Sequence, residues 1–349
     1  MNILSIDLGK YKSVFCMYET TTNEHYFGTI KTIPQEIHDL VTGKDPDKVV
    51  FEIGTPAGWI TDIVRALGKP VEVANTTHDA WRWKNVKKKS DRDDALKLAQ
   101  LSAMAQLPTV HVPQKSVREK RSFIQYRQKL VRRRTQIKNT IRAILQREGI
   151  TMAVGKQAWS KEGLAYLRKL ARAIGKITDP GDLWKGQLHT ELKLFKDIAE
   201  AISRVELKLD KLGQADPNVK LLKTVTGIGP RSAEAIVAFL DQPQRFDNAK
   251  QVGCYVGLTP RRYQSSDTDR YGRITKQGNK LLRTLLVEIS WISLRHNPWA
   301  RDMYKRLLKG DKKRRKAAIV AVARKLLVRC WAMLRDQTEW NDNISKAAA

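Results

Sequence analysis

Residues 2–8, NILSIDL, decide the fold of the amino-terminal part of this chain. They form a short apolar run that carries Asp7 near its end and is broken at Gly9. Residues 47–53, DKVVFEI, repeat the arrangement, with Glu52 near the end and a Gly-Thr-Pro break after it. Short apolar runs bounded by turn residues are typical of buried strands. We therefore expect two core strands, each with one carboxylate near its carboxyl end.

The segments around these two runs complete a mixed pattern of strands and helices. Further strands are expected at residues 12–18, 25–32 and 71–75, and helices at residues 34–41, 57–68 and 91–104. The resulting order is three strands, helix, strand, helix, strand, helix, which is the pattern of the ribonuclease H-like fold. The sequence therefore predicts an α/β domain of this type over residues 1–112.

Four carboxylates, here called the acidic quartet, would meet in that fold. Asp7 and Glu52 lie on strands that would be neighbours in the sheet. Asp91 and Asp94 are three residues apart at the start of a helix and so share one helical face. Carboxylates grouped in a strongly basic chain suggest Mg²⁺ held against nucleic-acid phosphates.

Each member of the quartet also has a simpler explanation. Asp91 and Asp94 suit the first turn of a helix, for which Ser90 is a plausible cap. Asp7 can simply end a strand, and Asp93 points to a different face of the helix from Asp91 and Asp94. Taken one at a time, these residues favour the structural explanation; taken together, they favour the metal site.

The composition of the whole chain indicates a polyanion partner. Its 349 residues include 65 Lys and Arg against 36 Asp and Glu, a formal net charge of +29 at pH 7. No apolar run reaches the roughly 20 residues of a membrane-spanning helix, Met1 leads directly into a strand, and the three cysteines form no paired motif. We therefore expect a cytoplasmic protein with no membrane partner, associated with the nucleoid when bound to DNA.

Three segments of the amino-terminal part carry a family resemblance. They are SIDLGKYKS at 5–13, FEIGTPAGW at 51–59 and KKSDRDDALKLA at 88–99. These segments resemble the three catalytic blocks of the DEDD-type insertion-sequence transposases, the IS-one-ten family. The resemblance implies a RuvC-like catalytic domain in which the acidic quartet binds Mg²⁺.

The middle of the chain, residues 113–215, reads as helical and basic. Residues 116–148 contain neither Gly nor Pro, show an apolar stripe at helical spacing, and include Arg132, Arg133 and Arg134. A second long helix is expected at residues 189–212, with apolar residues three and four apart. The pair is either an ordinary helical hairpin with a solvated charged face or, as we prefer, an antiparallel coiled coil used for dimer contact and phosphate binding. The family resemblance supports the coiled coil.

The carboxy-terminal part, residues 216–349, is expected to be mostly helical. Gly227 and Gly229 predict a tight turn before a helix that starts at Pro230, as in a helix-hairpin-helix; a structural turn and a DNA contact are both open. An exposed, Gly-punctuated loop rich in Arg, Ser and Lys follows at residues 257–279. Its cations could stabilise the charge of a phosphodiester while a serine attacks; they are Arg261, Arg262, Arg273 and Lys276.

This loop also resembles the transposase domain of the same family. The matching features are GLTP at 257–260 and GRITKQGN at 272–279. Family members carry a nucleophilic serine shortly after the proline, which the resemblance assigns to Ser265. Gln264 precedes it and Ser266 stands where glycine is usual, so Ser266 is the alternative nucleophile.

The leading hypothesis is a transposase, a DNA recombinase that moves an insertion sequence. The resemblance implies a covalent phosphoserine intermediate, Mg²⁺ as cofactor, donor and target duplex DNA as substrates, and a bridge RNA that guides target choice. We expect a homodimer and, in the synaptic complex, a tetramer. Two other functions stay open: a hydrolytic RuvC-like junction-resolving endonuclease, and a non-catalytic nucleic-acid-binding protein. A sugar-kinase-like ATPase fits less well, because no second glycine-rich phosphate loop is found.

Overall fold

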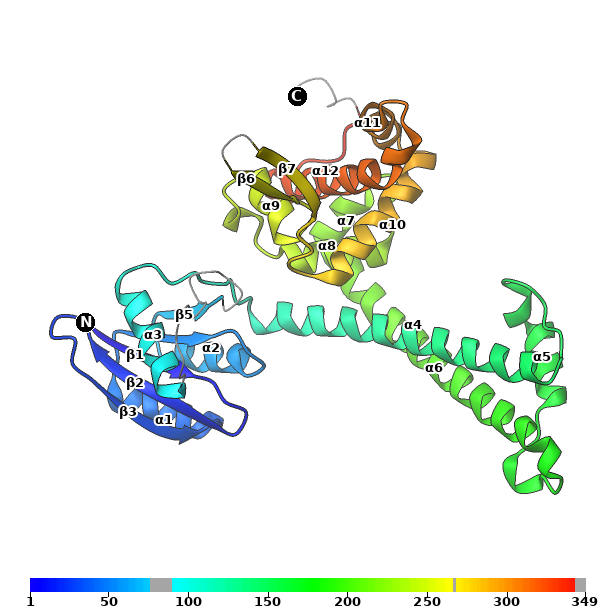
Figure 1. Cartoon of the computed structure of the whole chain (residues 1–349), viewed down its shortest axis with the longest axis horizontal. Helices are drawn as coiled ribbons and strands as arrows, with labels where there is room; N and C mark the ends of the chain where they lie inside the picture. Colours follow the sequence, from blue (N-terminus) through cyan, green and yellow to red (C-terminus); the bar gives the residue numbers. More distant parts are fainter. Residues whose placement is uncertain (76–89, 266–267, 343–349) are drawn as a thin grey trace. The chain divides into compact units, whose positions relative to one another are not determined.

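The computed structural model describes residues 1–75, 90–265 and 268–342 (Figure 1). The chain divides into two compact units, Met1–Glu119 and Lys120–Ala349. The division into residues 1–112, 113–215 and 216–349 stays a prediction.

The first unit is built on a five-stranded mixed sheet. Its strands are β1 (Asn2–Asp7), β2 (Lys12–Glu19), β3 (His25–Lys31), β4 (Lys48–Glu52) and β5 (Val71–Ala74). They lie in the order β3-β2-β1-β4-β5. The β3-β2-β1 part is antiparallel, whereas β1, β4 and β5 run parallel. The predicted order of strands and helices is confirmed, and this mixed α/β unit is consistent with a ribonuclease H-like fold.

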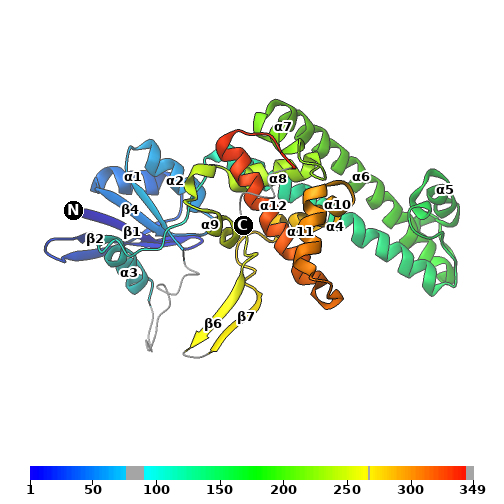
Figure 2. The ribbon, with the colours of Figure 1, turned by 90° about the horizontal axis from the view of Figure 1, so that it is seen from above.

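Helices cover both faces of this sheet because its central strands are apolar on both sides. Leu4 and Ile6 of β1 pack against α1 (Pro34–Lys44) and α2 (Ala57–Ala66). Ile3, on the opposite face of the same strand, packs with Leu98 of α3 (Asp91–Ala103). The result is a helix–sheet–helix sandwich (Figure 2).

Two long helices dominate the start of the second unit. They are α4 (Lys115–Arg147) and α6 (Leu183–Ala215), with the shorter α5 (Lys161–Leu170) between them (Figure 1). Leu130 clusters with Leu209, near the end of α6, whereas Ile141 clusters with Leu188, near its start. The helices therefore pack antiparallel. The helical hairpin is confirmed, α6 begins six residues before the predicted start at residue 189, and the coiled coil stays a prediction.

The rest of the second unit is a cluster of helices around α12. The helices are α7 (Pro217–Lys223), α8 (Pro230–Leu240), α9 (Ala249–Tyr255), α10 (Lys280–His296), α11 (Pro298–Leu308) and α12 (Arg315–Asp336). Apolar side chains of α12 such as Leu326 and Leu327 are fully buried in the main core. The mostly helical character of this region was predicted correctly. None of the helices in the described part of the chain is both long and apolar enough to cross a membrane.

The expected loop around the serines is wrong as secondary structure. The described residues of this segment instead form two strands, β6 (Pro260–Ser265) and β7 (Thr268–Ile274), which pair antiparallel as a β-hairpin. Periodicity could not reveal these strands, because nearly every side chain on them is exposed and polar, so they show no apolar alternation.

Candidate active site and nucleic-acid interface

The pairing of β1 with β4 brings Asp7 and Glu52 to the same edge of the sheet. Ile6 is paired with Phe51 in parallel register, so Asp7 and Glu52 each come one residue later on adjacent strands. Adjacent strands lie about 4.8 Å apart and side chains alternate between faces. Both carboxylates therefore belong to the face that carries Ile3 and Val50, which is the face covered by α3.

The direction of α3 adds Asp94 to this edge. Ser5 Oγ donates a hydrogen bond of 2.7 Å to the Ala95 carbonyl at the start of the helix. Lys48, at the other end of β4, lies 3.5 Å from Ser102 near the end of the helix. The start of α3 thus lies over the carboxyl ends of β1 and β4. Asp94 is only 7% exposed there. We call Asp7, Glu52 and Asp94 the acidic edge.

The cap of α3 uses a different aspartate from the two that belong to the acidic quartet. Ser90 is the cap, as predicted: its hydroxyl accepts from the Asp93 amide at 3.3 Å, while Asp93 Oδ2 accepts from the Ser90 amide at 3.0 Å. This reciprocal capping box uses Asp93. Capping therefore accounts for neither Asp91, which is exposed, nor Asp94, which is buried. Although the two residues share one face of the helix, Asp91 is exposed to solvent whereas Asp94 is buried beside the sheet.

The acidic edge suits Mg²⁺ in its chemistry but is not a preformed cage. All of its donors are carboxylate oxygens, the ligands that this ion prefers. Among the described residues, no group of three or more His, Cys, Asp or Glu side chains could hold a metal ion as it stands. Residues 88–89 of the third catalytic block lie outside the described residues. The donor set fits Mg²⁺, provided that the carboxylates close around it.

Ser265 lies at the tip of the β6–β7 hairpin, on one defined face of that ribbon. Ser265 pairs with Thr268 and Tyr263 with Arg270, so these four side chains share the same face. Arg261 belongs to the same side of β6, where its Cβ and the Tyr263 ring both approach Gly272. The alternative nucleophile, Ser266, lies outside the described residues. We call this side of the hairpin the serine face. The sequence alone did not place Tyr263 and Arg270 on it, because that placement depends on the pairing of the two strands.

The opposite face of the hairpin is largely neutralised. Arg262 donates two hydrogen bonds to Asp269, of 2.8 and 3.0 Å, and its guanidinium lies 5.6 Å from the centre of the Tyr271 ring. The ion pair raises the pKa of Arg262 above its ordinary value. Arg261 makes no ion pair with the carboxylates of the described residues. Of the two adjacent arginines Arg261 and Arg262, Arg261 is therefore the more available to bind a phosphate.

The base of the hairpin is held by two close backbone approaches. Gly257 and Gly278 both have positive φ, of 67° and 73°. A Cβ at Gly278 would stand 1.9 Å from the Tyr255 carbonyl oxygen, and one at Gly257 would stand 2.3 Å from that of Gln277. Glycine is required at both positions for sterics as well as for φ. The hairpin is thus fixed at its base, whereas Ser265 at the end of β6 is exposed.

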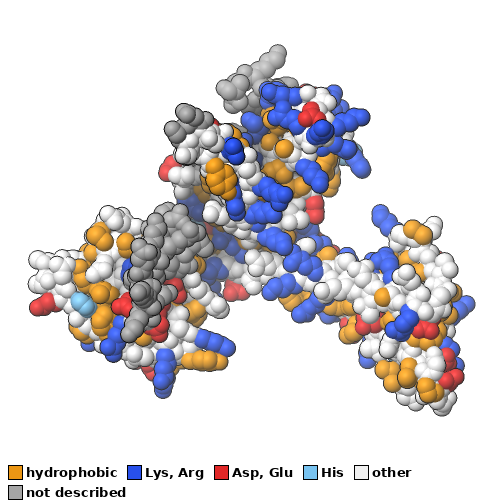
Figure 3. Space-filling view, in the orientation of Figure 1, with side chains coloured by type: hydrophobic (Ala, Val, Ile, Leu, Met, Phe, Trp, Pro, Cys, Tyr) orange, Lys and Arg blue, Asp and Glu red, His pale blue; other side chains and the backbone are white. Residues whose placement is uncertain are grey.

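The three arginines predicted to bind nucleic acid on α4 differ in exposure. Arg132 and Arg133 are exposed and Arg134 is half-buried, and none of the three pairs with a carboxylate of the described residues. Figure 3 shows Lys and Arg side chains over α4 and over the carboxy-terminal helices, with few Asp or Glu side chains among them. This surface fits a phosphate backbone.

Sequence reasoning missed Lys138, one turn beyond these arginines. Its Nζ lies 4.7 Å from the centre of the Trp159 ring and 5.5 Å from that of Phe195. Burial lowers the pKa of Lys138, and the nearby Arg134 and Arg142 lower it further. Arg134, Lys138 and Arg142 thus form a row of cations on one side of α4, beside the Trp159 ring.

The predicted helix-hairpin-helix turn is present between α7 and α8, and it has a structural role. Gly227 adopts a φ of 103°, and a Cβ there would stand 2.4 Å from Ser293 Oγ of α10. Ile228 is 5% exposed. The turn is therefore packed against the core of the second unit, and its glycine is explained without a DNA contact.

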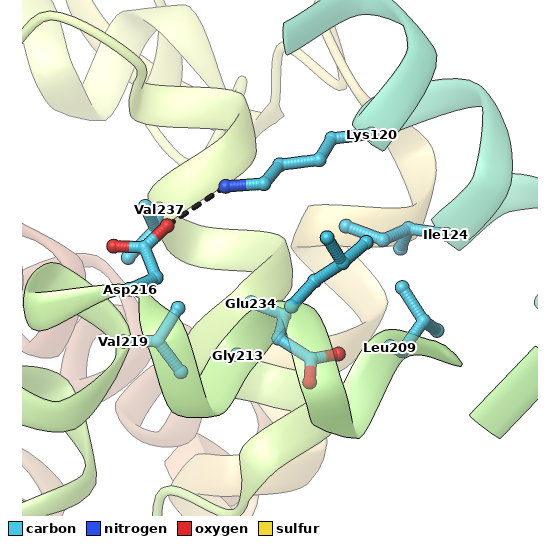
Figure 4. Close-up of a pocket in the computed structure, with 9 residues that line it drawn as sticks. Lys120, Ile124, Leu209, Gly213, Asp216, Val219, Glu234 and Val237 are labelled. Atoms are coloured by element: carbon cyan, nitrogen blue, oxygen red, sulfur yellow. Dashed lines mark hydrogen bonds and ion pairs between the residues drawn. The ribbon is translucent and has the colours of Figure 1, made fainter. Parts of the chain in front are cut away.

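A carboxylate of a different kind is buried at the root of the helical hairpin. Glu234 of α8 is 6% exposed, and neither of its carboxylate oxygens has a hydrogen-bond partner among the described residues. The side chain points toward the segment of α6 with Leu209 and Gly213, whereas Lys120 is paired with Asp216 at 2.8 Å (Figure 4). Burial raises the pKa of Glu234 to about 7, partly opposed by the guanidinium of Arg231 3.2 Å away.

Comparisons with known proteins cover most of the chain. Residues 4–149 match the DEDD-type transposase family model, and residues 219–305 match the model described as transposase IS116/IS110/IS902 family. A "Probable family 20 transposase" of Pseudomonas aeruginosa is 29% identical over 97% of this chain and 98% of its own length. The transposase for insertion sequence element IS1111A of Coxiella burnetii is 27% identical over 97% of this chain and 90% of its own. A pilin gene-inverting protein of Moraxella lacunata is 28% identical over 42% of this chain and 47% of its own.

Proposed function

Because this chain belongs to the IS116/IS110/IS902 family of transposases, which cut and rejoin DNA, we propose that it moves an insertion sequence through a covalent bond between Ser265 and a DNA end. The similarity to a pilin gene-inverting protein supports recombination chemistry in general, since inversion also requires that cut ends be rejoined. A hydrolytic resolvase would not rejoin the DNA ends that it cuts. This alternative therefore agrees less well with membership of the chain in a transposase family.

The proposed step is a transesterification that balances without an external energy source. Ser265 Oγ forms a bond to phosphorus while the bond from phosphorus to the leaving deoxyribose oxygen breaks. The serine proton is lost to a base or to water, and the leaving oxygen takes up a proton. A strand hydroxyl then attacks the phosphoserine and reverses these changes, so the phosphodiester bond energy is conserved and no ATP is needed.

The acidic quartet is the proposed Mg²⁺ site. Asp7, Glu52 and Asp94 would hold the ion at the acidic edge, and Asp91 would close over it from the exposed side of α3. When bound, Mg²⁺ supplies positive charge to the pentacoordinate phosphorus and to the leaving oxygen. The register of β1 with β4 and the direction of α3 support this proposal. DEDD-type transposase domains typically depend on a divalent metal, which supports it further.

The serine face supports the choice of nucleophile. Arg261 and Arg270 would hold the non-bridging oxygens of the phosphodiester beside Ser265, and Tyr263 could stack on a neighbouring base. Arg273 and Lys276 follow near the base of the hairpin and would hold flanking phosphates. Arg262 would instead keep the ribbon rigid through Asp269.

We propose the remaining partners from the charge distribution and from the family. Donor and target duplexes would lie along the basic surface of α4, where Arg132, Arg133 and Arg134 bind phosphates. A bridge RNA would choose the sites by base pairing, which leaves the protein to recognise backbone and shape. The protein would act as a homodimer joined through a coiled coil of α4 and α6, as a tetramer in the synaptic complex, and in the cytoplasm on nucleoid DNA.

The test of this proposal is a protein–DNA adduct that survives denaturation. Reactions of the wild type with Mg²⁺ and element-end DNA should yield a peptide of residues 261–270 that carries a nucleotide on Ser265. Ser265→Ala should abolish the adduct. Thr268→Ala is the matched control, because it removes the hydroxyl directly across the hairpin on the same face. An adduct on Ser266 would move the nucleophile by one residue, and active enzyme without any adduct would favour the resolvase.

A further inference from the structure

A recessed groove in the second unit is lined by cations that no other feature explains. It is formed by α9, α11 and α12 and has a volume of about 460 Å³. Five of its lining residues are cationic and none is acidic. The cations are Lys250, Arg306, Arg324, Lys325 and Arg329. They come from segments up to 79 residues apart in sequence, so tertiary packing alone brings them together.

Most of these cations are not committed to partners within the protein. Lys250, Arg324 and Lys325 make no ion pair with any carboxylate among residues 1–75, 90–265 and 268–342. Arg324 and Lys325 are half-buried, and partial burial strengthens the electrostatic repulsion between their like charges. An anionic ligand would relieve this repulsion.

Arg329 is the most constrained of the five. Its guanidinium lies 3.6 Å from the centre of the Trp340 ring and 4.8 Å from that of Trp299. One nitrogen donates to the Asn341 carbonyl. Of the remaining two nitrogens, Nη1 is buried and has no acceptor among the described residues. The contacts with the two rings and with Asn341 hold Arg329 in place on the wall of the groove, where it adds positive charge.

The size of the groove selects the kind of ligand. Pockets of about 300–1,000 Å³ hold small organic ligands, so this groove can accept one nucleotide of a strand but not a double helix. Trp299 and Met303 give it an apolar floor, 5% and 7% exposed, beneath the cations. Cations over an apolar floor fit a phosphate with its attached sugar and base.

The position of the groove links it to the proposed nucleophile. Thr259 lines it and directly precedes β6, whose last residue is Ser265. At about 3.3 Å per residue, the hairpin covers about 20 Å from the groove to Ser265. A strand that runs from the groove along the hairpin would therefore pass Ser265 about 20 Å further on.

We infer that this groove, here called the α9–α11–α12 groove, binds one unpaired nucleotide of the DNA strand whose phosphodiester is attacked by Ser265. The inference rests on the proposed function, because it makes the groove an anchor for the reacting strand. DNA rather than RNA is favoured because the groove opens beside the hairpin that carries the nucleophile.

The test measures binding of a fluorescein-labelled 15-nucleotide single-stranded DNA, without Mg²⁺, by anisotropy over a range of salt. The full-length variant Arg324→Ala/Lys325→Ala should bind about tenfold more weakly at about 0.1 M salt. Its salt slope should be reduced by about 0.7, since this is the contribution of the one phosphate that the groove no longer neutralises. The matched control is Lys220→Ala/Lys223→Ala, which removes two exposed charges from α7 in the same unit. It should change binding by less than about twofold, and equal effects in the two variants would overturn the groove as a site.

A second readout needs no substitution and so does not depend on folding of a variant. In wild-type protein, the same oligonucleotide should protect Lys250 and Lys325 from acetylation, read by mass spectrometry, while Lys220 stays reactive. A lack of protection would overturn the inference. Single-stranded RNA of the same sequence should protect less, and preferential protection by RNA would overturn the assignment to DNA. Because no cleavage is measured, groove binding can be established even if the phosphoserine step is disproved by the adduct experiment.

Discussion

The acidic edge and the serine face differ in what holds their reactive side chains in place. Asp7 and Glu52 end strands whose neighbours Ile6 and Phe51 are fully buried, each stabilising the fold by about 1.5–3 kcal/mol. Ser265 ends a two-stranded ribbon with exposed side chains on both faces, and an isolated ribbon of this kind is marginally stable. The core thus fixes the carboxylates, whereas Ser265 is held only by the pairing of β6 with β7.

The largest expected effect comes from breaking the acidic edge. Asp7→Asn, Glu52→Gln or Asp94→Asn should each lower the rate of strand exchange by at least about 100-fold. Even the replacement of a residue that only hydrogen-bonds to a metal ligand lowers metal affinity or activity by about 10–100-fold. Nucleic-acid affinity should stay nearly unchanged, because these substitutions remove little of the phosphate-binding surface. Recombination assays and anisotropy would measure the two quantities.

Glu234→Gln is the matched control for these substitutions, because it also neutralises a buried carboxylate but lies in the second unit. It should retain strand exchange. Full recombination by two of the edge variants would eliminate the metal site. Asp91→Asn tests whether the exposed member of the quartet is needed as much as the buried one.

A partial effect is expected if the serine face acts on the acidic edge of another subunit. Mixing Ser265→Ala protein with Asp7→Asn protein should restore part of the activity, because one composite site in the heterodimer is intact. Neither protein should be active alone. If the mixtures stay inactive although each variant still forms dimers with wild type, then Ser265 and Asp7 of one active site belong to the same chain.

A smaller effect should come from the basic surface of α4. Changing Arg132, Arg133 and Arg134 together to Ala should reduce the slope of log affinity against log salt by about one unit for each phosphate that the helix no longer binds. A charge-matched triple variant of α5, Lys161→Ala/Arg168→Ala/Lys169→Ala, removes three exposed cations elsewhere in the same unit. An unchanged slope in the α4 variant would mean that its arginines are simply solvated.

The smallest effect on activity, but a measurable one on stability, is expected at Glu234. Its pKa is raised from 4.5 to about 7 in the folded chain, so between these pH values the folded state keeps a proton that the unfolded state has released. The unfolding free energy should therefore fall by up to about 3 kcal/mol as pH rises from 4.5 to 7, and then level off. Glu234→Gln should lack this dependence in urea unfolding at about pH 5 and about pH 8; an unchanged dependence would assign it to other groups.

The sequence by itself determined the order of strands and helices in the first unit and the helical character of the rest. Apolar runs and heptad-like spacing are local signals, and each reports one element at a time. The cap at Ser90 was predictable for the same reason, since a capping box spans only about four residues. The types of residue in the quartet and around the serines were visible in the same way.

Tertiary structure decided the features that depend on residues distant in the chain. The packing of Ser5 on Ala95 sets the direction of α3, and through it which aspartate joins the acidic edge. The pairing of Arg262 with Asp269 separates a neutralised face of the hairpin from the serine face, although the local sequence predicted only a loop. The α9–α11–α12 groove gathers cations from distant segments of the second unit. Such contacts arise from non-local backbone pairing and core packing, which local periodicity does not encode.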